Sequence, residues 1–177
     1  MSGTDRGVLY VIACGAGPAS ELATLVRLAQ AAGWTVCVGA TPAGWGFIDA
    51  KRLAALTGHP VRRDYSGRSG TWPPADGIIV APATLSTVDK LAAGIADSWA
   101  LSLLIECMGV DLPIVLAPNV NPALGRHPRF RRNVEELRGW GVSVLWDRSA
   151  APPVWMVPWP AILDELHARA RPGPEPS

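Results

Sequence analysis

Apolar runs and segments of helical periodicity alternate along most of the chain. Residues 8–14, 35–39, 78–81 and 112–117 are largely apolar runs, the pattern of buried parallel strands, and residues 142–146 predict a last strand. Between these runs the apolar residues recur at spacings of three and four. This spacing predicts helices over residues 21–32, 48–56, 133–138 and 162–170, and another that starts near residue 87.

The alternation predicts an α/β fold: a three-layer, doubly wound parallel sheet of five or six strands with right-handed connections. Ligands of such sheets bind beyond the carboxyl ends of the strands. The turns at residues 14–20, 41–47, 82–87 and 118–124 should meet at that edge, and they carry Gly, Thr, Ser and Asn. We expect a single domain over residues 1–170, followed by a disordered tail at residues 171–177.

The composition excludes several classes of protein. The chain has 177 residues, 49% of them hydrophobic, which is consistent with one globular domain. No apolar run reaches the roughly 20 residues that a membrane span needs. The net charge of +1 gives no reason to expect a nucleic-acid partner. Because the N-terminus lacks the basic-then-apolar layout of a signal peptide, we expect a cytoplasmic location.

The cysteines and tryptophans bear on the ligands that can be expected. Cys14, Cys37 and Cys107 are odd in number and widely spaced, so they predict neither a disulfide framework nor a metal site. Reduced thiols in the core are the simplest interpretation. The eight tryptophans are many for this length, and we expect some of them to line an interface or a flat aromatic ligand.

The turn after the first predicted strand contains Gly15 and Gly17. A dinucleotide-binding fingerprint also needs a third glycine in this turn and an acidic residue at the end of the second strand. The chain has neither, so NAD is not expected. Two interpretations remain. The glycines can let the helix and strand pack closely, or the helix N-terminus can bind a single phosphate.

The turn after the third predicted strand is rich in hydroxyl groups. Pro82 should end the strand, and Ser86 or Thr87 can cap the helix that follows. Backbone amides and hydroxyls at a helix N-terminus suit an anion or the polar edge of a ring. On spacing alone, an ordinary capped turn is the favoured interpretation of this segment.

Two motifs resemble those of the homo-oligomeric flavin-containing cysteine decarboxylases. Residues 82–87 read Pro-Ala-Thr-Leu-Ser-Thr against the family's Pro-Ala-Ser-Ala-Asn-Thr, and the helix at residues 90–97 also matches. Residues 118–125 resemble Pro-x-Met-Asn-x-x-Met-Trp, with Asn121 retained. The resemblance spans about residues 8–146. The chain departs from the family at Ser86, where Asn is usual, and at Gly125, which stands in place of Trp.

The resemblance implies a Rossmann-like flavoprotein fold with FMN as cofactor. It places the FMN phosphate among Gly15, Gly17, Ser20 and Thr41, with Phe47 beside the flavin. The isoalloxazine edge would meet the motif that starts at Pro82, through Ala83, Thr84, Ser86 and Thr87. Asp97 ends the matching helix segment and is included in the expected cofactor site.

The resemblance also implies catalytic residues. In the family the Asn of the second motif contacts the substrate carboxylate, so Asn121 is the candidate here; a turn asparagine is the alternative. Decarboxylases of the family usually carry a catalytic His at a place that falls near Arg68, and no His lies between Val61 and Ile78. His59 is the nearest one in sequence and is the second catalytic candidate.

The implied activity is the FMN-dependent oxidative decarboxylation of a cysteine to an enethiol. We expect the substrate to be the C-terminal cysteine of a ribosomally made precursor peptide, and the protein to be a homo-oligomer built on trimers, up to a dodecamer. Residues 147–161, rich in Pro and Trp, correspond to a segment that can close over substrate in the family, and an arm at a subunit interface is the alternative. Alternatives are a decarboxylase of the small-molecule phosphopantothenoylcysteine type, an FMN-binding regulatory or assembly protein without turnover, and, ranked last, a prenyl-transfer enzyme of related fold.

Overall fold

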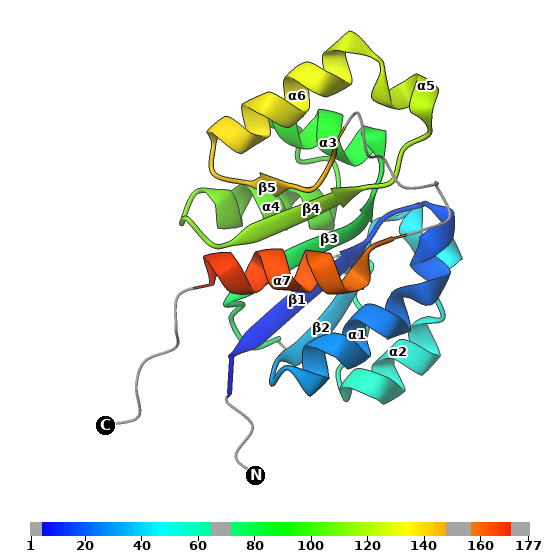
Figure 1. Cartoon of the computed structure of the whole chain (residues 1–177). Coiled ribbons are helices and arrows are strands. Elements are labelled where there is room, and N and C mark those ends of the chain that lie inside the picture. The colour runs from blue at the N-terminus through cyan, green and yellow to red at the C-terminus, as the bar shows by residue number, and fades with distance from the viewer. Residues whose placement is uncertain (1–4, 65–71, 148–156, 171–177) are drawn as a thin grey trace.

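A computed structural model describes residues 5–64, 72–147 and 157–170, and its strands form one parallel sheet (Figure 1). The strands are β1 (Val8–Ala13), β2 (Thr35–Ala40), β3 (Gly77–Ala83), β4 (Ile114–Pro118) and β5 (Ser143–Val144). Their order in the sheet is β2-β1-β3-β4-β5, and every neighbouring pair is parallel. The predicted α/β, doubly wound parallel sheet is confirmed.

Helices cover both faces of the sheet (Figure 1). They are α1 (Leu22–Ala31), α2 (Ala50–Thr57), α3 (Leu85–Ala92), α4 (Trp99–Met108), α5 (Pro122–Gly125), α6 (Pro128–Gly139) and α7 (Trp159–Arg169), with short 3₁₀ turns η1 (Gly17–Glu21) and η2 (Gly44–Phe47). Helices α1, α2 and α7 pack on one face, and α3, α4 and α6 pack on the other. No helix among the described residues is long and apolar enough to cross a membrane.

The alternation of side chains along each strand divides the core into two layers. In β1, Leu9 and Val11 face the layer that contains α1 and α7, whereas Tyr10 and Ile12 face the layer with α3, α4 and α6. Successive strand residues point to opposite faces, so one continuous apolar run supplies both layers. This explains why the strands read as uninterrupted apolar segments. Both layers pack on the same sheet; a single domain over residues 1–170 stays a prediction, and the predicted tail lies outside the described residues.

The start of helix α3 differs from the sequence prediction. The N-cap is Thr84, whose Oγ1 accepts a hydrogen bond from the amide of Thr87 at 3.3 Å; neither Ser86 nor Thr87 caps the helix. Strand β3 also continues one residue past Pro82. Thr87 is buried, and its hydroxyl donates to Sγ of Cys14. This residue therefore packs in the core and does not cap the helix.

Most of the described tryptophans belong to the core. Trp34, Trp72, Trp99 and Trp159 are buried, and Trp72 makes edge-to-face contacts with both Tyr10 and Trp99. The expectation that tryptophans line an interface or a flat ligand therefore does not apply to these four, because their rings fill the space between helices and sheet. Trp140 is half exposed, and Trp155 lies outside the described residues.

Candidate functional site

A cavity of about 240 Å³ opens where β2 and β3 end and where α3 and α4 begin. Its lining consists of Thr41, Pro42, Ala43, Thr84, Ser86, Thr87, Lys90, Asp97, Ser98 and Leu101. From β1 the chain passes to β2 on one side of the sheet, and from β3 it passes to β4 on the other side. The carboxyl ends of β1 and β3 therefore form the topological switch point of the sheet. Ligands of doubly wound sheets bind at that point. The position of the cavity therefore makes it the candidate site.

Three hydroxyl groups on the cavity wall also stabilise the turns that carry them. Oγ1 of Thr41 accepts from the amide of Gly44 at 3.1 Å, that of Thr84 caps α3, and Oγ of Ser98 accepts from the amide of Leu101 at 3.4 Å to cap α4. These bonds use oxygen lone pairs and leave the hydroxyl hydrogens out of the capping bond. The hydrogen of Thr84 is directed to Oγ1 of Thr87, because Thr87 donates its own hydrogen to Cys14. The hydroxyls of Ser86 and Ser98 and the ammonium group of Lys90 still provide donors on the cavity wall, which suits a ligand rich in acceptors, such as phosphate or a flavin edge.

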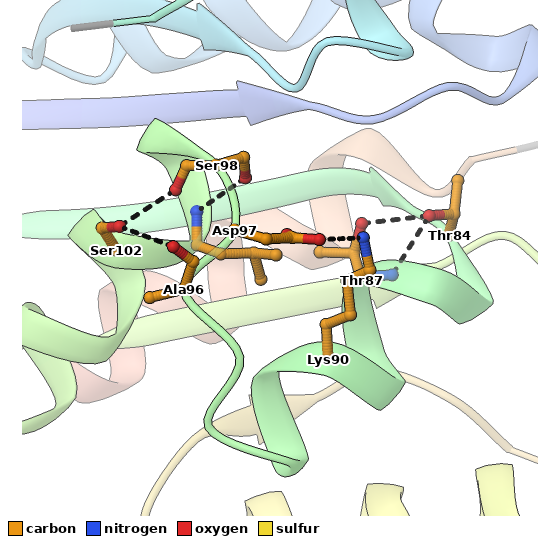
Figure 2. A network of polar contacts seen from close by, with 8 residues as sticks. Thr84, Thr87, Lys90, Ala96, Asp97, Ser98 and Ser102 are labelled. Carbon is orange, nitrogen blue, oxygen red and sulfur yellow. Dashed lines mark hydrogen bonds and ion pairs between the residues drawn. The ribbon is translucent and has the colours of Figure 1, made fainter.

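The charged groups of the cavity are Lys90 and Asp97. They form an ion pair with 2.6 Å between Nζ and Oδ2, which joins α3 to the loop that precedes α4 (Figure 2). That loop is further held by Ser102, whose Oγ donates to the carbonyls of Ser98 at 3.1 Å and Ala96 at 3.4 Å. Both members of the pair are partly exposed, so the pair contributes little to stability. Its Lys can instead shift toward an anionic ligand.

A chain of hydroxyl groups connects the cavity to the buried thiol of Cys14. Oγ1 of Thr87 lies 3.0 Å from Oγ1 of Thr84 and donates to Sγ of Cys14 at 3.2 Å. Burial raises the pKa of the Cys14 thiol, although the bond from Thr87 opposes this shift. Burial also raises the pKa of Cys37, to about 11. All three cysteines are free, and these two thiols stay protonated and unreactive, in agreement with the prediction of reduced core thiols.

The predicted phosphate turn is shaped first by packing. A Cβ atom built on Gly15 would lie 2.9 Å from Cβ of Ala43, and one built on Gly44 would lie 2.3 Å from the carbonyl oxygen of Ala13. The turns after β1 and β2 therefore cross too closely for side chains at these two positions. Gly17 borders open space, and Oγ of the exposed Ser20 donates back to its carbonyl at 3.1 Å. Close packing explains Gly15, while Gly17 and Ser20 remain accessible to a ligand.

The remaining predicted cofactor residues differ in exposure. Pro82 and Ala83 are buried in β3, and their carbonyls accept from the amides of Cys14 at 3.1 Å and Asn119 at 2.8 Å. These bonds tie the turns after β1 and β4 to the motif strand. Phe47 is 44% exposed on η2, where an aromatic ring is available to a ligand. Predicted residues that line the cavity itself are Thr41, Thr84, Ser86, Thr87 and Asp97.

The two catalytic candidates lie far apart. Asn121 is exposed at the carboxyl end of β4, where its Oδ1 accepts from the amide of Leu124 at 2.9 Å and caps α5. His59 follows the C-terminus of α2. This helix end lies next to the C-terminal end of α1, as the hydrogen bond from Nε2 of Gln30 to the carbonyl of Leu56 shows. That is the opposite edge of the sheet from the cavity. The segment near Arg68, where the family usually has a His, lies outside the described residues.

Sequence reasoning missed Lys90 and Ser98 as lining residues. Ser98 follows Asp97 immediately before an apolar helix, which is an N-cap pattern that the sequence does carry. Lys90 lies in the matching helix, but its approach to Asp97 depends on the turn at Gly94, which has a left-handed backbone with φ of 68°. No group of residues that could bind a metal ion is present among the described residues.

Comparison with known proteins places the chain in a family. The model of the Flavoprotein family matches residues 4–171. The chain belongs to this family. It is 32% identical over 143 residues to the coenzyme A biosynthesis bifunctional protein CoaBC of Bacillus subtilis; this covers 75% of the chain but only 34% of that protein.

Solved structures share the whole fold. The FMN-dependent cysteine decarboxylase TvaF from thioviridamide biosynthesis is 25% identical, with a TM-score of 0.73, and the match covers 90% of this chain and 98% of that one. The cypemycin decarboxylase CypD is also 25% identical, with a TM-score of 0.70 over 91% and 94% of the two chains. The family and the FMN-dependent neighbours support FMN as the cofactor. The cavity at the switch point offers Ser86, Ser98 and Lys90 as donors for part of such a ligand.

Proposed function

We propose that the protein is an FMN-dependent decarboxylase that acts on the C-terminal cysteine of a peptide. The observation that carries the proposal is the pairing of a donor-lined cavity at the switch point with an asparagine at the adjacent strand end. The chain's membership of the Flavoprotein family and its likeness over most of its length to cysteine decarboxylases support it. A small cysteine-containing substrate is the alternative that CoaBC suggests.

In this proposal, residues of two turns and two helix starts hold the cofactor. Ser86 and Ser98 offer hydroxyl hydrogens, and Lys90 offers a positive charge. Gly17, Ser20 and Phe47 border the same edge of the sheet and extend the site toward η1 and η2. FMN, when bound, supplies a two-electron oxidation of the cysteine CH₂–S unit, after which the adjacent carboxylate leaves as CO₂ and an enethiol remains.

Asn121 would hold the substrate carboxylate. Its Oδ1 is already used to cap α5, which leaves the two hydrogens of its Nδ2 as donors. A carboxylate is an acceptor-only group, so the available half of the amide matches the group that is lost. The cap also fixes the orientation of the amide, because turning the side chain over would break the bond to Leu124.

One observation favours a second function. The titratable residues that line the cavity are Lys90 and Asp97, which are paired with each other, and His59 lies at the other edge of the sheet. A general base near the cavity is therefore missing among the described residues. An FMN-binding regulatory or assembly protein without turnover would need no such base. The predicted homo-oligomer and cytoplasmic location remain predictions in either case.

The first experiment is a visible absorption spectrum of the purified protein, followed by release of the cofactor on heating. Flavin bands and free FMN are expected. Peptides that end in Cys are then assayed by mass spectrometry for the loss of CO₂ and two hydrogens. FMN binding without turnover of any peptide or small cysteine compound would refute the enzyme and favour the second function.

The variant Asn121→Asp is the test of the substrate contact. Aspartate also caps helices, so α5 is retained, but the two amide donors are lost and a negative charge faces the substrate carboxylate. We expect turnover to fall by about 100-fold or more while FMN stays bound, since one donor to a reacting group is worth about that factor. An unchanged rate would remove Asn121 from the site.

A further inference from the structure

The start of helix α6 carries the strongest concentration of charge in the sequence. Residues 126–132 contain four arginines, Arg126, Arg129, Arg131 and Arg132, and no acidic residue, although the whole chain has a net charge of only +1. Among the described residues, none forms an ion pair with these four guanidinium groups. The concentration of positive charge makes this surface attractive to an anionic partner.

A groove runs along the helix beside these arginines. It has a volume of about 700 Å³ and is lined by Pro128, Arg131, Arg132, Glu135, Arg138, Trp146 and Asp147. Two of the lining residues hold the wall in place: Arg138 pairs with Glu135 at 2.8 Å and donates to the carbonyls of Val144 and Trp146 at 2.8 and 2.7 Å. Arg131 and Arg132 remain to contact a ligand.

The groove lies near Asn121, at the substrate end of the candidate site. The indole of Trp146 lies against Gly125, where an added Cβ would be only 3.1 Å from the ring. The same indole packs edge-to-face on Phe130. Gly125 in turn donates its amide to the carbonyl of Asn121 at 2.9 Å. The groove therefore begins one helical turn from the asparagine that is proposed to hold the carboxylate.

We propose that this groove binds an acidic segment of the peptide substrate, located a few residues before the C-terminal cysteine. This inference rests on the proposed function and names the substrate class. A peptide whose last residue lies at Asn121 must leave the site along its N-terminal side, and the groove offers such a path. Asp or Glu side chains on that segment pair with Arg131 and Arg132, while Arg126 and Arg129 add to the attractive potential.

The spread of the charges favours a peptide over a single phosphate group. The groove-lining residues of α6 recur at helical spacings of three and four, and they are Pro128, Arg131, Arg132, Glu135 and Arg138. The helix from Pro128 to Arg138 is about 15 Å long. An extended peptide covers that length with about four or five residues. A phosphate binds best where several donors converge on one point, and Arg138 already donates to two backbone carbonyls and to Glu135, so it is not free to join Arg131 and Arg132 around one phosphate.

Binding is tested separately from turnover. The probe is a fluorescently labelled peptide with glutamates before a C-terminal serine, which cannot be decarboxylated, and its partner carries glutamine at the same positions. We expect the acidic probe to bind at least about tenfold more tightly at low salt, and this advantage to shrink in 0.5 M salt. Equal affinity of the two probes for the wild-type protein overturns the inference, whatever the outcome of the enzyme assay.

A matched pair of variants locates the contact. The variant Arg131→Glu/Arg132→Glu reverses the sign of the charge at two positions of the groove. The control Arg27→Glu/Arg52→Glu makes the same change in net charge at exposed positions of α1 and α2. The groove variant should lose the preference for the acidic probe, whereas the control should retain it. Loss of the preference in both variants overturns the groove as the site, because it would indicate only a general effect of net charge.

Turnover then distinguishes the two proposals. If peptides ending in Cys are decarboxylated equally well with Glu or Gln upstream, the proposed function stands and the acidic-segment inference fails. If no Cys peptide reacts but the acidic probe still binds through Arg131 and Arg132, the groove stands and the enzyme proposal fails. Turnover of a phosphorylated cysteine compound that depends on these arginines, without any preference among peptides, overturns the peptide as occupant.

Discussion

The hydrogen bond between Asn133 and Asp89 joins the helix of the cofactor cavity to the helix of the basic groove. Nδ2 of Asn133 donates to Oδ1 of Asp89 at 2.7 Å, and the asparagine is only 2% exposed. We predict that Asn133→Asp strongly destabilises the protein in a pH-dependent way. The change keeps the shape of the side chain and replaces a donor with a second carboxyl group, so two acceptors would face each other.

The expected cost follows from the distance. Two carboxylates about 3 Å apart repel by about 5 kcal/mol at an effective dielectric constant near 20, so one of them keeps its proton instead. Holding a proton at pH 7 on a group with an unfolded pKa of about 3.9 costs about 4 kcal/mol, and at pH 5 about 1.5 kcal/mol. The folded pKa is raised, so stability is fully present below the unfolded pKa and falls by about 1.4 kcal/mol per unit as pH rises.

Urea unfolding followed by far-UV circular dichroism at pH 5, 6 and 7 measures this dependence. The exchange variant Asp89→Asn/Asn133→Asp is the control, since it restores one amide and one carboxylate with the two helices interchanged. We expect it to recover to within about 1 kcal/mol of the wild-type free energy of unfolding, and to lose the extra pH dependence. A single variant with no added pH dependence, or an exchange variant no more stable than the single one, would refute the reasoning.

Two further predictions concern other parts of the fold. Nε1 of Trp34 donates to Nε2 of His167 at 3.0 Å, and burial, with Arg6 nearby, lowers the pKa of that imidazole. The neutral imidazole therefore contributes to the unfolding free energy above the unfolded pKa of about 6.5, and this contribution is lost as pH falls through the lowered folded pKa. His167→Gln should therefore weaken the dependence of the unfolding free energy on pH between 7 and 5; an unchanged dependence argues against the bond. Gly44→Ala should cost about 1–3 kcal/mol of unfolding free energy, because its Cβ would collide with a backbone carbonyl, whereas Gly46→Ala, which meets no atom within 4 Å, should cost less than about 1 kcal/mol in the same urea titration.

The fold could be predicted because its signals are local. Strands buried on both faces must be apolar throughout, and helices on their surfaces must be apolar on one side, so the two periodicities are written directly in the sequence. The contact of His167 could not be predicted in this way: the side chain is partly buried, and its Nε2 accepts a hydrogen bond from Nε1 of Trp34. Such a contact joins residues 133 positions apart, and no local pattern encodes it.

The site was predictable in its turns but not in its details. Thr84, Ser86 and Thr87 could each cap the helix after β3, and tertiary structure decides between them. The hydroxyl of Thr87 donates to the buried Cys14, and Thr84 caps the helix. The pairing of Lys90 with Asp97 likewise depends on a left-handed turn at Gly94, which sequence periodicity does not reveal. The roles of individual predicted residues in binding or catalysis remain predictions.

The departures from the family motifs acquire a physical meaning in this structure. The family's second motif ends in Trp, and here Gly125 stands in its place. A Cβ atom at position 125 would lie 3.1 Å from the indole of Trp146, so a side chain there would require the ring to shift. A tryptophan at position 125 would therefore compete for space with Trp146, which packs beside α5 from the segment after β5. Because the same ring forms a wall of the arginine-lined groove, this exchange couples the end of the motif to the surface that we propose for an acidic peptide.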